Sequence, residues 1–226
     1  MKARLKSKPL RKAGRRFSAT VNGDGSARKQ LLTSARHLFA RRGLSGCSIR
    51  DIADAASVNS SLISYYFASK EGLYRACIEE IAEASLEMTR KVLQPAKNET
   101  EYRLRLQMFL DNLFQLFLED RDTGLILIRE YDRQHSPAED IFKDSFLEVL
   151  GQIVEYFKQA QKQKILDEKK DPFTLAGLLF GCFTSQMRMD HLKEHSKQKS
   201  LLNAQEKRKV ENHIVDLFTI PPKNRE

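Results

Sequence analysis

The chain has 226 residues, a net charge of +9 and 41% hydrophobic residues. This length and composition suffice for one or two domains, each with a packed core. No apolar run approaches the roughly 20 residues of a membrane-spanning helix, and the basic N-terminus does not lead into the apolar segment of a signal peptide. We therefore exclude a membrane-spanning protein and expect a cytoplasmic one with no membrane contact.

The positive charge is concentrated at the N-terminus. Eight basic residues precede Ser26 and the only acid there is Asp24, so this segment carries +7, while the remaining 31 basic and 29 acidic residues leave +2. Residues 1–25 also have few apolar positions, which predicts a disordered basic arm. Such an arm can neutralise DNA phosphates or insert arginines into the minor groove. The alternative is a tail that only aids solubility.

The first ordered segments predict a compact helical domain over residues 26–70. Apolar residues recur at helical spacing between Ala27 and Arg42, and Gly43 is a typical helix stop. Ser48 and Asp51 form a capping box that starts a second helix, and Asn59 is a cap for a third. Two short helices joined by a tight turn are typical of a DNA-binding helix-turn-helix.

The rest of the chain, residues 71–220, predicts a helical body. A long helix runs from Lys70 to about Leu93 and connects the two parts. Later starts are predicted at the capping box Ser136-Pro137-Ala138-Glu139, with Pro137 at the first helical position, at Asp171-Pro172, and at Asn203, which pairs with Glu206. The apolar face of the last helix is expected to carry Val210, Ile214 and Leu217. Because no segment alternates as a strand does, the fold class is all-α with about nine helices.

Three short motifs carry a resemblance to a known family. They are Leu38-Phe39 followed by Gly43, Asp51-Ile52-Ala53, and the run from Tyr65 to Glu71, YYFASKE. In these residues the segment from about Arg28 to Tyr74 resembles the TetR family of bacterial transcriptional regulators (TetR/AcrR type). The resemblance implies a homodimer that places one recognition helix per subunit in the major groove of a pseudo-palindromic double-stranded DNA operator.

The resemblance also implies the DNA-contacting residues. Arg50 is the candidate for reading a guanine edge, and the turn that opens the recognition helix faces the bases. The full set of expected contacts is Ser48, Arg50, Asn59, Ser60, Ser61, Leu62, Ser64, Tyr65, Tyr66 and Lys70. Ser64 departs from the usual tyrosine, and Ser57 from the usual turn glycine. Leu62 and Tyr66 have the alternative role of covering the core of the domain.

A ligand pocket in the body is likewise implied by the resemblance. Arg129, Glu130 and Tyr131 end an apolar run and can project polar groups between the body helices, although Arg129 and Glu130 can also simply pair with each other. The other expected pocket residues are Phe109, Leu113, Phe146, Phe183, Gln186 and Met187. The alternative for each is plain core packing. The sequence does not identify the small-molecule effector.

Dimerisation is expected through the helices Pro172–His195 and Asn203–Phe218, because two apolar helices can form a four-helix interface with their twins. The expected function is a repressor released from its operator by a ligand. The alternative is an architectural or cell-division DNA-binding protein that recruits a protein partner and senses no metabolite.

Other chemistry has little support in the sequence. His191 and His195 match H-x-x-E-H, a spacing that can bind zinc, but no further motif supplies a third ligand. Cys47, Cys77 and Cys182 lie far apart and lack C-x-x-C spacing, so reduced thiols are expected. No phosphate-binding, nucleophile or dinucleotide motif occurs, so we expect neither an enzyme nor a cofactor.

Overall fold

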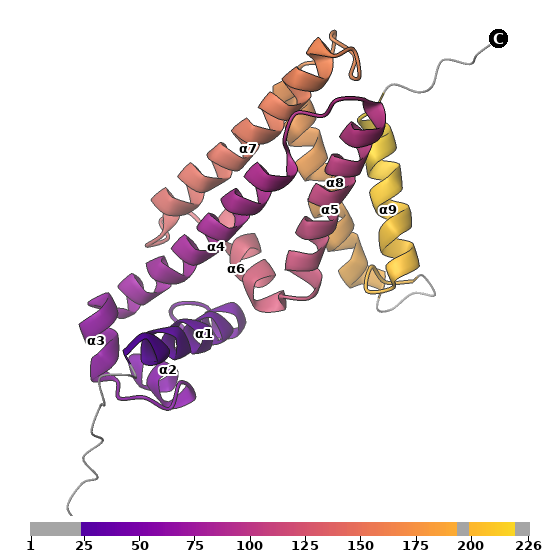
Figure 1. Cartoon of the computed structure of the whole chain (residues 1–226). Coiled ribbons are helices and arrows are strands. Elements are labelled where there is room, and N and C mark those ends of the chain that lie inside the picture. The colour runs from indigo at the N-terminus through magenta and orange to yellow at the C-terminus, as the bar shows by residue number, and fades with distance from the viewer. Residues whose placement is uncertain (1–23, 194–198, 220–226) are drawn as a thin grey trace, which may run out of the picture.

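The computed structural model of the chain describes residues 24–193 and 199–219. Within these ranges the backbone forms only helices, and the prediction of an all-α fold is confirmed (Figure 1). The nine helices are α1 (Asp24–Arg42), α2 (Ile49–Ala55), α3 (Ser61–Phe67), α4 (Lys70–Val92), α5 (Glu99–Leu118), α6 (Arg121–Asp132), α7 (Glu139–Lys162), α8 (Pro172–Lys193) and α9 (Ala204–Leu217).

The three N-terminal helices pack at one end of the long helix α4 (Figure 1). Gly43 ends α1 with a φ of 72°, a conformation that glycine adopts without strain. Gly72 is required for a different reason, because a Cβ there would lie 1.9 Å from the carbonyl oxygen of Phe67. This close approach sets the sharp corner between α3 and α4.

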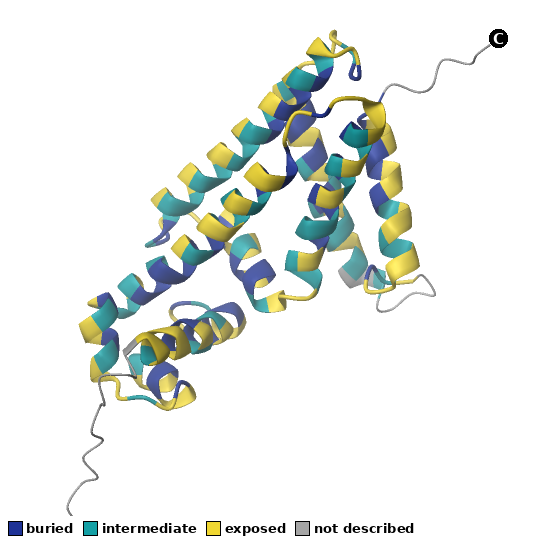
Figure 2. Cartoon of the chain, in the orientation of Figure 1, coloured by how far each residue is buried: buried dark blue, intermediate teal, exposed yellow. Residues whose placement is uncertain are grey.

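The core of the N-terminal helices continues into the body. Leu31, Ile52 and Ile63 are fully buried, and the same cluster includes Leu73 of α4 and Ile126 of α6. Figure 2 shows the buried residues on the helix faces that turn toward neighbouring helices. Helices α1 to α3, called the reader helices below, are therefore packed onto α4 and α6 in one continuous apolar cluster.

A second core fills the body, where α7 runs beside α4 and α9 lies against α5 (Figure 1). Two buried tyrosines organise it. The rings of Tyr102 and Tyr156 stack with centroids 5.2 Å apart. The Tyr102 hydroxyl donates to the Phe218 carbonyl oxygen at 2.8 Å, and the Tyr156 hydroxyl donates to the carbonyl of Tyr102 at 2.9 Å. These bonds tie the end of α9 to α5 and α7.

Side-chain caps start most of the body helices. Asn203 Oδ1 accepts from the backbone N–H of Gln205 and Glu206, at 3.1 Å each, so the predicted cap of α9 is present. Asp171 Oδ2 accepts from Thr174 N at 2.7 Å just before α8. These polar groups fix the first turns because the opening N–H groups of a helix have no partner within the helix.

The start of α7 differs from the prediction. The helix begins at Glu139, so Pro137 lies in the preceding turn and not at the first helical position. Ser136 Oγ accepts from Ala138 N at 3.2 Å, and the Glu139 carboxylate accepts from His135 N at 2.7 Å. The same residues thus bond within the turn, and the helix has no side-chain cap.

The apolar face of α9 also differs from the expected one. Ile214 is buried as predicted, but Leu217 is 64% exposed. The buried positions are instead Glu211, Ile214, Val215 and Phe218. They also recur at helical spacing, but the buried face of the helix is rotated about its axis relative to the expected one. The side chain of Glu211 is only 1% exposed, and neither of its carboxylate oxygens has a hydrogen-bond partner among the described residues.

Candidate functional site

The helix-turn-helix begins with the predicted capping box. The Ser48 hydroxyl oxygen accepts from Asp51 N at 3.1 Å, and the Asp51 carboxylate accepts from Ser48 N at 2.7 Å. The Ser48 hydroxyl also donates to this carboxylate, and the bonds from Ser48 lower the pKa of Asp51. The proton of the Ser48 hydroxyl is therefore already used within the box.

The turn between α2 and α3 is tight and left-handed. Ser57 has a φ of 56°, and Val58 N donates to the Ala53 carbonyl oxygen at 3.0 Å. Ser57 occupies the position where the resemblance leads one to expect glycine, so the serine holds this conformation at a backbone cost of about 1 kcal/mol. The turn geometry is retained despite the substitution.

The recognition helix α3 turns a polar surface to solvent. Asn59 Oδ1 accepts from Ser61 N at 2.8 Å in the turn before the helix, but the N-cap residue is Ser60, without a side-chain cap hydrogen bond, so the predicted cap at Asn59 is wrong by one position. Ile63 and Phe67 are buried, whereas Ser64 and Tyr65 are exposed, Tyr65 to 73%. The exposed members of the expected DNA-contacting set are Ser48, Arg50, Asn59, Ser60, Ser61, Ser64 and Tyr65.

Three expected contacts have other partners within the protein. Leu62 and Tyr66 are half-buried and pack against the N-terminal core. The Lys70 ammonium donates to the carbonyl oxygens of Leu44 and Cys47 at 2.9 and 3.0 Å. Lys70 therefore anchors the loop that precedes α2.

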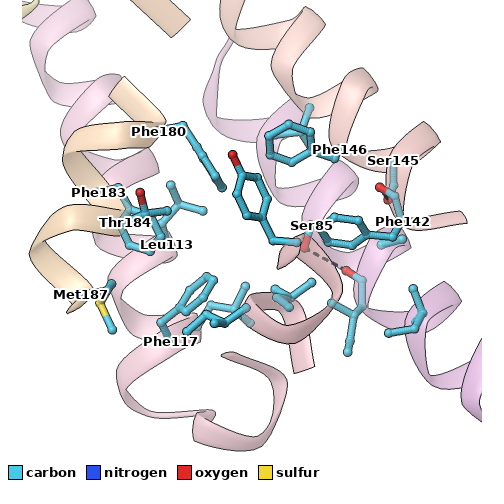
Figure 3. Close-up of a pocket in the computed structure, with 18 of the residues that line it drawn as sticks. Ser85, Leu113, Phe117, Phe142, Ser145, Phe146, Phe180, Phe183, Thr184 and Met187 are labelled. Atoms are coloured by element: carbon cyan, nitrogen blue, oxygen red, sulfur yellow. Dashed lines mark hydrogen bonds between the residues drawn. The ribbon is translucent and has the colours of Figure 1, made fainter. Parts of the chain in front are cut away.

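A cavity lies within the body and is lined by residues from α4 to α8 (Figure 3). Its volume is about 140 Å³. Leu113, Phe146, Phe183 and Met187, four of the eight expected pocket residues, line it. Tyr131 of α6, expected to project between the body helices, also lines it, as does Phe180 of α8, which sequence reasoning missed.

The other four expected pocket residues lie elsewhere. Phe109 is buried in the body core, and Gln186 is half-buried on α8 but does not line the cavity. Arg129 and Glu130 do not pair with each other as the alternative had it. Arg129 instead reaches α1, and Glu130 reaches α4.

These two residues connect α6 to α1 and α4. Arg129 Nη1 donates to the carbonyl oxygen of Phe39 at 2.8 Å, near the C-terminal end of α1, where the helix dipole favours a cation. The Tyr74 hydroxyl donates to Glu130 Oε1 at 2.6 Å, and both side chains are buried. Burial, followed by the bond to Glu130, raises the pKa of Tyr74, so the phenol keeps its proton.

Helix α6 therefore has two functional faces. Leu127, Ile128 and Tyr131 line the cavity, while Arg129 and Glu130, between them in sequence, bond to α1 and α4 respectively. Both side chains between Ile128 and Tyr131 therefore make hydrogen bonds to other helices.

Several expected features lie outside the described residues. They are residues 1–23 of the basic arm, His195, and the side chain of His191. Among the side chains that the structure describes, no group of three or more His, Cys, Asp and Glu residues is arranged to hold a metal ion. Across the same ranges, no helix has the length and apolar character needed to cross a bilayer.

Comparison with known proteins identifies the N-terminal region. Residues 31–77 match the model of the bacterial regulatory proteins of the tetR family. Over 88 residues the chain is 33% identical to the probable HTH-type transcriptional regulator YttP of Bacillus subtilis, a match that covers 39% of this chain and 42% of YttP. Over 114 residues it is 32% identical to the HTH-type transcriptional dual regulator CecR of Shigella flexneri, a match that covers 47% of this chain and 50% of CecR.

The whole fold has solved counterparts. A putative fatty acid metabolism regulator from Clostridium perfringens superposes with a TM-score of 0.68 at 21% identity, covering 85% of this chain and 100% of that one. The matches confirm the resemblance in the N-terminal region: residues 31–77 match the tetR family, and the relatives that align here are helix-turn-helix transcriptional regulators. The sequence matches span about half the length of the curated relatives, 42% and 50%.

Proposed function

We propose that the protein is a dimeric transcriptional repressor that binds a pseudo-palindromic DNA operator and is released when a small molecule occupies the body cavity. The observation that carries the proposal is the double role of α6, which lines the cavity and bonds to α1 and to the start of α4. Two relatives are named HTH-type transcriptional regulators, which supports the DNA-binding part of this proposal.

DNA reading is assigned to the exposed polar surface of α2 and α3. Arg50 is exposed on α2, and Asn59, Ser60 and Ser61 are exposed where α3 begins. Serine and asparagine side chains can bond phosphates or base edges, and a guanidinium can bond a guanine edge with two hydrogen bonds. Sequence preference is therefore expected to depend most on Arg50.

Selection of DNA from a random pool by the purified chain tests this assignment. The enriched sites should contain an inverted repeat. The Arg50→Ala variant should lose about 1–3 kcal/mol of operator affinity and relax the preference at one position of each half-site. Arg90→Ala is the matched control, because Arg90 is an exposed arginine near the far end of α4, paired with Glu148. Equal affinity of Arg50→Ala and the parent protein would refute the assignment.

Coupling between cavity and reader is assigned to the contacts of α6. A ligand that displaces Tyr131 or Ile128 moves the helix whose next residues bond Phe39 and Tyr74. Because the ligand and the operator favour different positions of α6, each should lower the affinity of the other by the same factor.

The coupling can be measured with any compound that raises the unfolding temperature of the protein in a screen. The Tyr74→Phe variant removes the bond to Glu130 and should bring the ratio of operator affinities with and without compound closer to one. Tyr102→Phe is the control, since it also removes a buried tyrosine hydrogen bond, but one within the body core. If both variants keep the full ratio, the Tyr74 contact does not transmit the signal.

Dimerisation is assigned to α8 and α9. Phe173, Leu178 and Leu217 are large apolar residues that are more than half exposed on these helices. Large apolar residues that remain exposed on a helix can belong to a protein interface. Sedimentation at micromolar concentration should give a dimer, and Leu178→Glu should shift it toward the monomer; a parent chain that sediments as a monomer contradicts the assignment.

The alternative, an architectural or cell-division DNA-binding protein that senses no metabolite, predicts a solid body core. The cavity lined by five helices favours the ligand-responsive function instead. The alternative gains support if DNA binding is strong but no compound in a broad screen changes it.

A further inference from the structure

The cavity has a definite size. Its volume of about 140 Å³ is close to the roughly 150 Å³ of an apolar cavity known to hold one benzene molecule. A ligand that enters without further opening of the helices is therefore built on a single ring. The wall contributed by α6 gives access, since the side chains of Tyr131 and Ile128 are 53% and 42% exposed.

The walls of the cavity are aromatic. The rings of Tyr131, Phe146 and Phe180 come from three different helices, and their centroids lie 5.0 to 5.9 Å from one another. Phe183 continues this cluster next to Phe180, and Figure 3 shows Phe146, Phe180 and Phe183 around the same space. Aromatic rings favour edge-to-face and offset contacts with further rings, so a flat aromatic ring gains more here than a saturated one.

The three aliphatic hydroxyl groups of the wall are oriented as acceptors, while the fourth hydroxyl, that of Tyr131, can donate as well as accept. Ser85 donates to the Ile81 carbonyl oxygen at 2.8 Å, Ser145 to that of Ile141 at 2.7 Å, and Thr184 to that of Gly181 at 3.2 Å. Each of these three hydroxyls has a single proton, which its own helix already uses, but its lone pairs remain available. A ligand that bonds to these groups must bring its own donor.

The lining carries almost no charge. None of the described lining residues is an acid, so a cation would lose its hydration with no compensating carboxylate. The only charged lining residue is Arg188, which is exposed and already makes another interaction. An uncharged ligand is therefore favoured over either ion.

We propose that the cavity binds an uncharged molecule built on one aromatic ring that carries a hydroxyl group, in other words a phenol. The ring packs among Phe146, Phe180 and Phe183, and the hydroxyl donates to Ser85, Ser145 or Thr184. This inference rests on the proposed function in one respect only, that this cavity is the effector site, and it names the chemical class of the effector.

Calorimetric titration of the full chain without DNA tests the proposal with five matched probes. The probes are 4-ethylphenol, 4-methylanisole, 4-ethylcyclohexanol, benzylammonium and 4-ethylbenzoate. The phenol should bind on the order of 2- to 10-fold more tightly than the ether, which lacks the donor, and than the saturated alcohol, which lacks the aromatic ring. Both ions should bind at least about 10-fold more weakly than the phenol.

Variants locate the site. The Ala82→Phe variant places a ring into the cavity from α4 and should weaken 4-ethylphenol binding by about 10-fold or more, whereas Ala84→Phe, at an exposed position of the same helix, should leave it unchanged. At least one of Ser85→Ala, Ser145→Ala and Thr184→Val should weaken phenol binding about 2- to 10-fold without affecting the ether. The last three variants keep the test decisive if Ala82→Phe does not fold.

Opposite results overturn the proposal. Binding of 4-ethylbenzoate as tight as that of the phenol indicates an anion site at Arg188. Equal binding of phenol and ether, or no loss in any hydroxyl variant, removes the donor from the ligand class. Because these titrations contain no DNA, their failure with intact operator binding refutes the ligand class alone, while loss of operator recognition refutes the DNA-binding function alone.

Discussion

Replacement of Glu211 by glutamine should stabilise the protein, and the gain should depend on pH. Glu211 lies on α9 with its side chain 1% exposed and faces α5. Burial raises its pKa from 4.5 to about 7, and the nearby carboxylate of Asp111 contributes in the same direction. Lys207 and Arg208 oppose the shift, but the Lys207 ammonium is already bonded to Asp111 at 2.6 Å.

The magnitude follows from the proton linkage. Between pH 4.5 and about 7 the folded protein holds a proton on Glu211 that the unfolded chain has released, so the free energy of unfolding falls as the pH rises through this window. At about 1.4 kcal/mol per pKa unit, the loss above pH 7 amounts to about 3 kcal/mol. Below pH 4.5 both states are protonated, and the loss disappears.

The Glu211→Gln variant keeps the shape of the side chain and cannot ionise. Urea unfolding followed by circular dichroism, at one fixed protein concentration, should show it to be more stable than the parent protein by about 3 kcal/mol at pH 8 and by less than about 1 kcal/mol at pH 5. Glu168→Gln is the control, because Glu168 is exposed in the turn before α8 and should show no such pH dependence. A gain that is equal at both pH values, or absent at pH 8, would refute the reasoning.

Three further predictions concern other parts of the chain. Ser57→Gly relieves a left-handed serine and should raise the free energy of unfolding by about 1 kcal/mol in urea titrations, whereas a loss of stability would show that the serine is not strained. Burial raises the pKa of Cys77 to about 12, so this thiol should resist iodoacetamide at pH 8 in the native protein. The half-buried Cys182 should react faster, as peptide mass mapping can establish. Removal of residues 2–22 should weaken operator binding at all sequences and flatten its salt dependence, and an unchanged salt slope would mean that the arm makes no phosphate contact.

Local signals predicted much of the fold. The capping box at Ser48 and Asp51 and the cap at Asn203 are present because each depends on residues within a few positions of one another. The start of α7 was misplaced because the same polar residues can bond either within a turn or to a helix end. The sequence alone does not decide between these two local arrangements.

Contacts between distant helices were harder to predict. Helical periodicity identified Phe109 as buried but not the neighbour against which it packs, so it was assigned to the cavity when it lies in the core. Arg129 and Glu130 were recognised as polar residues at an apolar helix end, yet their partners Phe39 and Tyr74 are 90 and 56 residues away. Glu211 was missed because a buried carboxylate is the exception in an apolar stripe.

The continuous core between the reader helices and α6 limits how the protein can be divided and recombined. A hybrid regulator that joined residues 24–70 to another body would lose Leu73 and Ile126 from the apolar cluster and Arg129 from the end of α1. The graft must therefore carry the first half of α4 and meet an α6 of matching shape. Exchange of the N-terminal helices alone is therefore limited by how well they fit α6. Under the proposed function, substitution of exposed residues such as Arg50 is the easier route to a new DNA specificity.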